Sequence, residues 1–235
     1  MTVASNLACI GLDVRRRSDF REMVTAARAE AETIVKDGEV GVHVWTDTSG
    51  ARLIITTEGD LVRVVTPSFH ADPGAILSEP QAIDGGVVLA ELVDQHDEVF
   101  TEIACQLEEL ALLSAAPQPV EGPASVVVLG NAVRVTGRAD VRAGERVGGV
   151  RPGLVFEPTG AYAATTDAVA HLTGVVLEVE ERTVARTGQA FTAARVQTAG
   201  FRITLCVPAG DPSLAAGDVV DVDGYVVVSL PALRG

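Results

Sequence analysis

The side chains that could carry acid–base or metal chemistry are few and scattered along this chain. Its four histidines are His43, His70, His96 and His171. None lies in an H-x-H, H-x-x-x-H or HExxH arrangement, which would bring two ligands onto one side of a strand or helix. Each is therefore typical of a structural or exposed histidine, and the sequence indicates no metal site and no catalytic residue.

Motifs for nucleophilic catalysis and phosphate binding are also missing from the sequence. There is no G-x-S-x-G or S-x-x-K motif, and Lys36 is the only lysine, which excludes the usual P-loop. The three cysteines, Cys9, Cys105 and Cys206, are far apart, set in apolar sequence and without basic neighbours. They are typical of buried, reduced thiols rather than of a disulfide framework or a metal site. No cofactor is implied.

Two places in the sequence suit a ligand. His43 and Trp45 are two residues apart on a predicted strand, so their side chains share one face of it. This pair of an imidazole and an indole predicts a ligand-facing patch; the alternative is a sheet face covered by the preceding helix. Arg182 and Arg186 stand in the segment RTVARTG, a predicted loop that can reach a phosphate or another anion. The alternative there is a solvated hairpin loop.

Composition excludes several classes of protein. Of the 235 residues, 47% are hydrophobic and 21% charged, as in ordinary globular proteins, and no apolar run is long enough to cross a membrane. The basic cluster Arg15–Arg17 follows the first apolar run, the reverse of a secretory signal, so we expect a cytoplasmic protein. The net charge of −14 argues against nucleic-acid binding, because phosphates are neutralised by Lys and Arg.

A β-α-β-β-β succession is predicted for residues 5–66. The apolar run Leu7–Val14 suits the first strand. Ser18 is a suitable N-cap for a helix whose apolar residues recur at helical spacing until Gly38 ends it. Three strands then follow, separated by tight turns: Val40–Thr46, Ala51–Thr57 and Leu61–Thr66.

The pattern is weaker in the middle of the chain. Residues 68–86 contain several Pro and Gly residues and are predicted to be irregular, and a strand is predicted at Val87–Val93. Apolar residues recur at helical spacing between Asp97 and Leu113, which predicts a helix there. A strand over Val99–Leu107 is the alternative.

The proline-rich stretch SAAPQPVEGPAS contains the predicted linker, residues 115–124. It divides the chain into an α+β domain at 1–114 and a β-rich domain at 125–235. The second domain opens with a strand-like run, Ser125–Gly137, that holds a Gly-Asn turn or bulge. Short β-branched segments follow His171, separated by Gly, Thr-Gly and Asp-Pro turns.

This last part of the chain, at about 168–230, resembles an OB fold. Gly174–Glu180, Ala193–Thr198 and Phe201–Val207 match its first three strands, and Leu214–Val228 matches its closing part, where a strand turns at a Gly into the last strand. The resemblance implies a small closed barrel of the kind that binds oligonucleotides or oligosaccharides. The few aromatic residues and the excess of acids here depart from the basic, stacking groove that single strands require.

The module at residues 5–66 resembles one half of the vicinal-oxygen-chelate fold. Such modules pair around a metal or small-molecule site, and residues 67–113 do not repeat the module, so the resemblance implies a homodimer. His43 and Asp13 are the candidate ligands, but no matching set of histidines and carboxylates accompanies them.

These patterns together predict an α+β protein in which a helix-backed antiparallel sheet precedes a small OB-like β-barrel. We expect a non-enzymatic binding or interaction module that forms a homodimer and does not associate with membranes. One alternative is a small-molecule-binding or metal-assisted enzyme that uses the N-terminal sheet. The other is weak nucleic-acid binding through the barrel.

Overall fold

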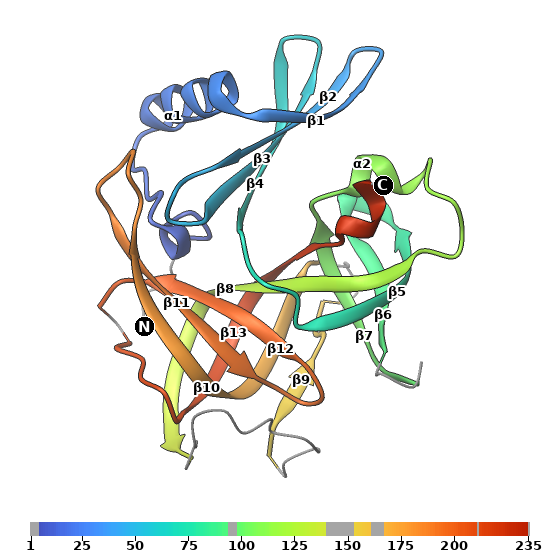
Figure 1. Cartoon of the computed structure of the whole chain (residues 1–235). Coiled ribbons are helices and arrows are strands. Elements are labelled where there is room, and N and C mark those ends of the chain that lie inside the picture. Colours follow the sequence, from blue (N-terminus) through green and yellow to red (C-terminus); the bar gives the residue numbers. More distant parts are fainter. Residues whose placement is uncertain (1–4, 94–97, 140–152, 161–166, 211, 235) are drawn as a thin grey trace.

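The chain folds into two β-sheets that pack against each other (Figure 1). The computed structural model describes residues 5–93, 98–139, 153–160, 167–210 and 212–234. Within them the fold is mostly β, with a four-stranded sheet, a nine-stranded mixed sheet and two short α-helices. It is therefore not clearly the α+β class expected from the sequence. No helix in these ranges is long and apolar enough to span a membrane.

The four-stranded sheet is antiparallel, in the order β1-β2-β3-β4. Its strands are β1 (Glu32–Asp37), β2 (Val40–Thr46), β3 (Ala51–Glu58) and β4 (Leu61–Phe69). Helix α1 (Arg17–Glu30) packs on one face of this sheet through Met23, Val24 and Ala27, which recur at helical spacing. The three strands predicted at 40–46, 51–57 and 61–66 are confirmed.

The helix is shorter than the sequence predicts. It ends at Glu30, and the residues predicted to complete it form β1 instead. This segment contains Thr33, Ile34 and Val35, whose β-branched side chains suit a strand, and it pairs with β2 across a turn at Gly38. The apolar residues of this segment fit a helix as well as a strand, and pairing with β2 selects the strand.

The first strand predicted, Leu7–Val14, is wrong. Ala8–Ile10 forms a single 3-10 turn, which ends at Gly11 with φ 69°. Cys9, Ile10 and Leu12 are fully buried, so the apolar run enters the core without joining a sheet. A Cβ at position 11 would clash with Val184 and Gln189, which explains why glycine stands there.

The nine-stranded sheet has the order β11-β12-β8-β5-β6-β7-β13-β10-β9. Its strands are β5 (Ala75–Ala82), β6 (Val88–Val93), β7 (Val99–Leu107), β8 (Glu121–Arg138), β9 (Val155–Glu157), β10 (Val169–Thr183), β11 (Ala190–Gln197), β12 (Arg202–Pro208) and β13 (Asp218–Ser229).

The strand pairings in this sheet close on themselves. β10 pairs with β11 and β13, β12 pairs with β11 and β8, and β8 pairs with β13, so these five strands form a closed ring. β5, β6 and β7 connect the first residues of β8 to the last residues of β13 and form a second ring. The long β8–β13 pair is the wall that both rings share, and Figure 1 shows β8 crossing from one to the other.

The helix predicted over 97–113 is wrong, and the alternative strand is confirmed as β7. Pairing with β6 directs Ile103 and Cys105 into the core, while Glu102 is exposed. Helix α2 is confined to Leu110–Leu113. The apolar residues of this segment satisfy both periods, and the partner strand β6 decides between them.

Three other predictions about strands have different outcomes. The strand β6 confirms the one predicted at 87–93, whereas β5 lies in the region predicted to be irregular. The Gly-Asn bulge is confirmed, because the register of β8 against β13 shifts at Asn131. The turn predicted at Gly224 is wrong, since β13 continues through it and β8 closes the ring instead.

The predicted linker at 115–124 overlaps the start of β8, which begins at Glu121. Strands from both sides of it, β5–β7 and β8–β13, belong to one hydrogen-bonded sheet. Shared hydrogen bonds do not test whether each part folds alone, so the division at 115–124 stays a prediction about independent folding.

Two large clusters of buried side chains form the core. One fills the two rings, and the other lies between the four-stranded sheet, α1 and the first ring. In the second cluster Phe69 of β4 meets Phe191 of β11 edge to face, with ring centroids 5.8 Å apart. The predicted buried, reduced thiols are confirmed, since Cys9, Cys105 and Cys206 are buried and free.

We expect Phe191→Ala to lower the free energy of unfolding by about 3–5 kcal/mol, because it empties a fully buried site between the two sheets. Phe100→Ala is the matched control, since this ring is 39% exposed and should cost less. Urea unfolding measures both, and equal losses would contradict the assignment of Phe191 to the contact between the sheets.

Candidate functional site

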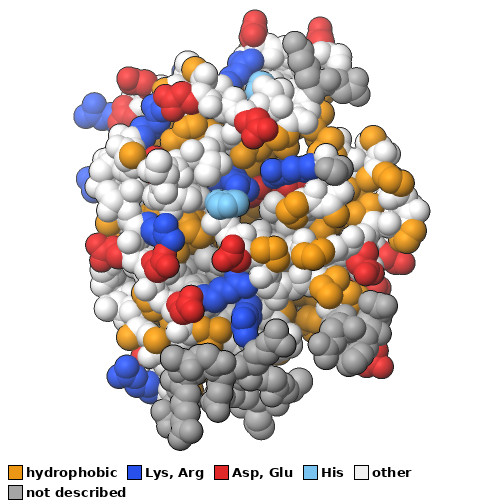
Figure 2. Space-filling view, in the orientation of Figure 1, with side chains coloured by type: hydrophobic (Ala, Val, Ile, Leu, Met, Phe, Trp, Pro, Cys, Tyr) orange, Lys and Arg blue, Asp and Glu red, His pale blue; other side chains and the backbone are white. Residues whose placement is uncertain are grey.

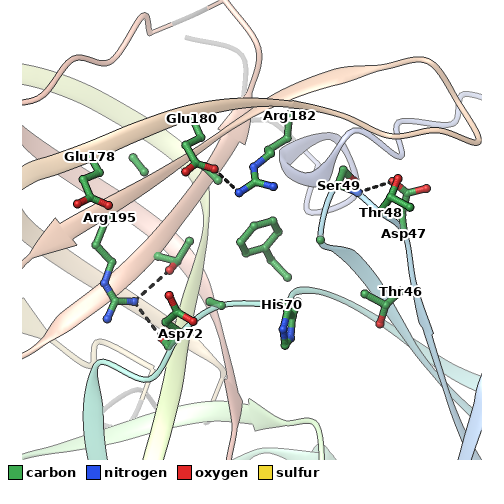
Figure 3. A pocket seen from close by; sticks show the side chains of 16 residues that line it. Thr46, Asp47, Thr48, Ser49, His70, Asp72, Glu178, Glu180, Arg182 and Arg195 are labelled. Atoms are coloured by element: carbon green, nitrogen blue, oxygen red, sulfur yellow. Dashed lines mark hydrogen bonds and ion pairs between the residues drawn. The ribbon is translucent and has the colours of Figure 1, made fainter.

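A pocket of about 360 Å³ lies between the four-stranded sheet and the outer face of β10–β12 (Figure 3). Charged side chains of both signs gather on the face of the molecule drawn in Figure 2. The pocket is lined by Thr46, Asp47, Thr48, Ser49, Gly50, Phe69, His70, Ala71, Asp72, Glu178, Glu180, Arg182, Ala193, Ala194, Arg195 and Thr204. The site therefore draws on segments that are far apart in the sequence.

The turn between β2 and β3 forms one side of the pocket. The Asp47 carboxylate accepts hydrogen bonds from the backbone N–H groups of Ser49, at 2.9 Å, and Ala185, at 3.2 Å. Burial alone would raise the pKa of Asp47, but these hydrogen bonds and the nearby Arg186 guanidinium hold it below its usual range. The Asp47 carboxylate thus links the β2–β3 turn to the loop after β10, and its role is structural.

Strand β10 forms the opposite side. Glu178, Glu180 and Arg182 alternate along it and therefore project from one face toward the pocket (Figure 3). Arg182 forms an ion pair with Glu180 through Nη2. Its Nε is the one buried side-chain nitrogen or oxygen without a hydrogen-bond partner among the residues that the structure describes.

Arg195 of β11 anchors the segment after β4. Its guanidinium donates to the backbone carbonyls of Asp72, at 2.9 Å, and Pro73, at 2.8 Å, and to Thr204 Oγ1, at 3.4 Å. Burial lowers the pKa of Arg195, with a further contribution from Arg202. The carboxylates of Asp72 and Glu178 line the pocket, are exposed, and oppose the lowering of the Arg195 pKa, but neither forms a hydrogen bond or close ion pair with a described side chain.

His70 connects the pocket to a buried ionic network. Its Nδ1 accepts a hydrogen bond from Nη2 of Arg52, at 2.6 Å, so the ring is neutral. Desolvation and the Arg52 guanidinium lower the pKa of His70. Arg52 also forms a 2.6 Å ion pair with Glu108, whose other oxygen accepts a 2.5 Å hydrogen bond from Ser68. This network therefore joins β3 and β4 to the residues after β7.

A second buried glutamate extends the network to the last described residues. Glu109 accepts hydrogen bonds from Ser229 Oγ, at 2.8 Å, and from the backbone N–H of Leu230, at 2.9 Å. Arg234 lies 2.6 Å from Glu109 and 3.4 Å from Glu108. Two arginines thus neutralise two adjacent buried carboxylates. Burial raises the pKa of Glu108, and the neighbouring Glu109 adds to the shift.

His43 lies away from the pocket, although the sequence predicts it as a ligand residue. Its ring lies between the hydroxyls of Thr33, at 2.9 Å from Nδ1, and Thr57, at 3.3 Å from Nε2. Desolvation and Arg28 lower its pKa. These contacts are those of a histidine that is satisfied within a sheet.

Trp45 and Arg186, two other predicted site residues, do meet, though not at the pocket. Trp45 is 5% exposed and lies in the cluster that α1 covers, as the alternative interpretation of this face holds. The Arg186 guanidinium lies 5.5 Å from the centre of its ring. Glu30 accepts hydrogen bonds from both, at 3.3 Å from Trp45 and 2.6 Å from Arg186. This trio joins α1 to the loop after β10.

Arg182 is the one predicted site residue that lines the pocket. His70, Asp72, Glu178 and Arg195 are pocket residues that the sequence analysis did not single out. The alternation of charge in E-x-E-x-R over 178–182 was a signal for one wall, since it places three charged side chains on one strand face. No sequence signal indicates that residues 70–72 lie opposite that wall.

Comparisons with protein-family models, with curated proteins and with solved structures found no match to this chain. Within the ranges that the structure describes, no group of three or more His, Cys, Asp or Glu side chains is arranged to hold a metal ion.

Removing the positive charge of Arg52 should leave the buried carboxylate of Glu108 without its closest cation. We expect Arg52→Met to lower the free energy of unfolding by about 3–5 kcal/mol at neutral or higher pH. Arg63→Met is the matched control, because its ion pair with Glu58 is on the surface and is worth about 1 kcal/mol or less.

The loss in Arg52→Met should shrink as the pH falls from about 8 to about 5. The pKa of Glu108 is already raised in the folded protein, so without Arg52 this carboxyl takes up a proton and no longer needs a cation. Urea unfolding at the two pH values tests this, and a loss that does not change with pH would contradict it.

Proposed function

We propose that this chain is a non-enzymatic binding protein that holds a small polar molecule in the pocket between its two sheets. One observation carries the proposal: side chains from the β2–β3 turn, the end of β4 and strands β10–β12 converge on a space of about 360 Å³. A volume of this order suits a small ligand.

The chemistry of the lining supports binding rather than catalysis. Asp47, Arg182 and Arg195 are engaged in hydrogen bonds or ion pairs within the protein, and the neutral ring of His70 accepts a hydrogen bond from Arg52. A general base needs a nucleophile or a substrate proton within reach. The pocket groups that make no hydrogen bond to a described side chain are the carboxylates of Asp72 and Glu178 and the Nε of Arg182, and such groups recognise a ligand by charge and hydrogen bonding.

The scaffold for this site is, in our proposal, an OB-like barrel made of β8 and β10–β13. A closed ring of five strands supports it. In place of a terminal hairpin, the ring uses β8, which precedes the other four strands in the sequence. The buried free thiols fit a reducing, cytoplasmic location.

A thermal-shift screen of small polar compounds tests the binding function. A compound that binds the folded state raises the melting temperature, because binding adds to the free energy of unfolding. We expect at least one compound to stabilise the wild type and also Ala115→Phe, which changes an exposed alanine after α2 that does not line the pocket. We do not expect it to stabilise Ala71→Phe, which fills the pocket.

The absence of any stabilising compound for the wild type would overturn the proposal. An equal shift in Ala71→Phe would also overturn it, because the binding would then take place elsewhere. Circular dichroism of Ala71→Phe establishes that the variant is folded before the comparison is made.

A further inference from the structure

We infer that the ligand of this pocket is a small zwitterion, with an ammonium group and a carboxylate joined by a short carbon chain. This inference rests on the proposed binding function. It follows from the side-chain groups around the pocket that make no hydrogen bond within the described parts of the protein.

Two carboxylates at the pocket would bind the ammonium group of the ligand. Asp72 and Glu178 both line the pocket, and neither makes a hydrogen bond or ion pair with another side chain in the described ranges. The Arg195 guanidinium interacts electrostatically with both carboxylates, but its N–H groups donate to two backbone carbonyls and Thr204 and to neither carboxylate. Figure 3 shows the three side chains on one side of the pocket. A cation from outside the protein would complete this arrangement.

Arg182 is the residue that would bind the carboxylate of the ligand. The Nε of this guanidinium is buried without an acceptor, so a donor has been taken out of water and has no replacement partner. Glu180 engages Nη2, and a guanidinium has five N–H donors, enough for a second carboxylate. The Arg182 side chain is 39% exposed, so it has room to turn toward a ligand.

The carbon chain of the ligand has apolar lining to pack on. Phe69, Ala71 and Ala193 provide it, next to the charged groups. A ligand with only an ammonium group would leave the Arg182 donor unsatisfied, and one with only a carboxylate would approach two unpaired carboxylates. The zwitterion satisfies both ends, and the short chain bridges them over the apolar surface.

A matched series of three probes tests this inference: γ-aminobutyrate, butylamine and butyrate. They share one carbon chain and differ in which charged ends they carry. Isothermal titration with the wild type should give at least about tenfold tighter binding for γ-aminobutyrate than for either other probe, since a hydrogen bond to a charged group is worth roughly 1.5–3 kcal/mol. A parallel series with one carbon fewer and one more allows for the span between the two ends.

Variants assign each end of the probe. The double variant Asp72→Asn/Glu178→Gln should bind γ-aminobutyrate no better than the wild type binds butyrate, and Arg182→Gln should bind it no better than the wild type binds butylamine. Glu102→Gln, an exposed glutamate on β7, is the control that leaves all affinities unchanged.

The outcomes separate this inference from the proposed function. If butylamine or butyrate binds as tightly as the zwitterion, the ligand class is overturned while a binding pocket stands. If none of the probes binds but other compounds raise the melting temperature of the wild type and not of Ala71→Phe, the ligand class alone is overturned. If nothing binds in either experiment, both are overturned.

Discussion

The buried ion pair between Arg52 and Glu108 is the interaction on which the arrangement of the two sheets depends. Arg52 belongs to the four-stranded sheet, and Glu108 directly follows β7 of the nine-stranded sheet; their side chains are 9% and 1% exposed. A buried pair contributes little net stability compared with apolar packing, but either charge alone in the core is costly. The pair therefore selects one docking of the sheets, and it places His70, hydrogen-bonded to Arg52, at the pocket.

The β8–β13 pair is the second constraint, because both rings are built on it. The two strands stay paired from Ser125 opposite Ser229 to Arg138 opposite Asp218, with bulges at Asn131 and Thr136. At Gly224 a Cβ would collide with Val128 and the Leu129 carbonyl, so the close approach of the strands requires glycine there. A strand pair this long supports β10–β12 on one side, which form the pocket wall, and β5–β7 on the other.

The sequence predicts the elements whose signals are local. The strands at 40–46 and 51–57 follow from β-branched residues separated by a tight turn, and those of the 174–207 region follow from the same pattern. At 99–107 the apolar residues fit both the helical and the strand period. Only the partner strand decides between them, and the local sequence does not identify that partner. The ring closure by β8 was not predictable for the same reason, since its partners β12 and β13 come more than 60 residues later.

The site was predictable to a smaller extent. Arg182 was identified as an anion-binding candidate, whereas Asp72 and Glu178 are brought together by contacts across about half of the chain. His43 and Trp45 share a strand face, as their spacing predicts, but Trp45 packs against α1 and the His43 ring hydrogen-bonds to Thr57 of the neighbouring strand. The spacing of residues in the sequence therefore predicts which side chains share a strand face, but it does not predict which other element covers that face.

The most direct test of this fold is whether the two sheets unfold together. Trp45 is the single tryptophan and reports on the four-stranded sheet, while far-ultraviolet circular dichroism reports on all strands. We expect the two signals to give coincident urea transitions, because the Arg52–Glu108 pair and the Phe69–Phe191 contact make the sheets one cooperative unit. Loss of the Trp45 signal at a clearly lower urea concentration would contradict this, and would mean that the pocket lies between parts that separate independently.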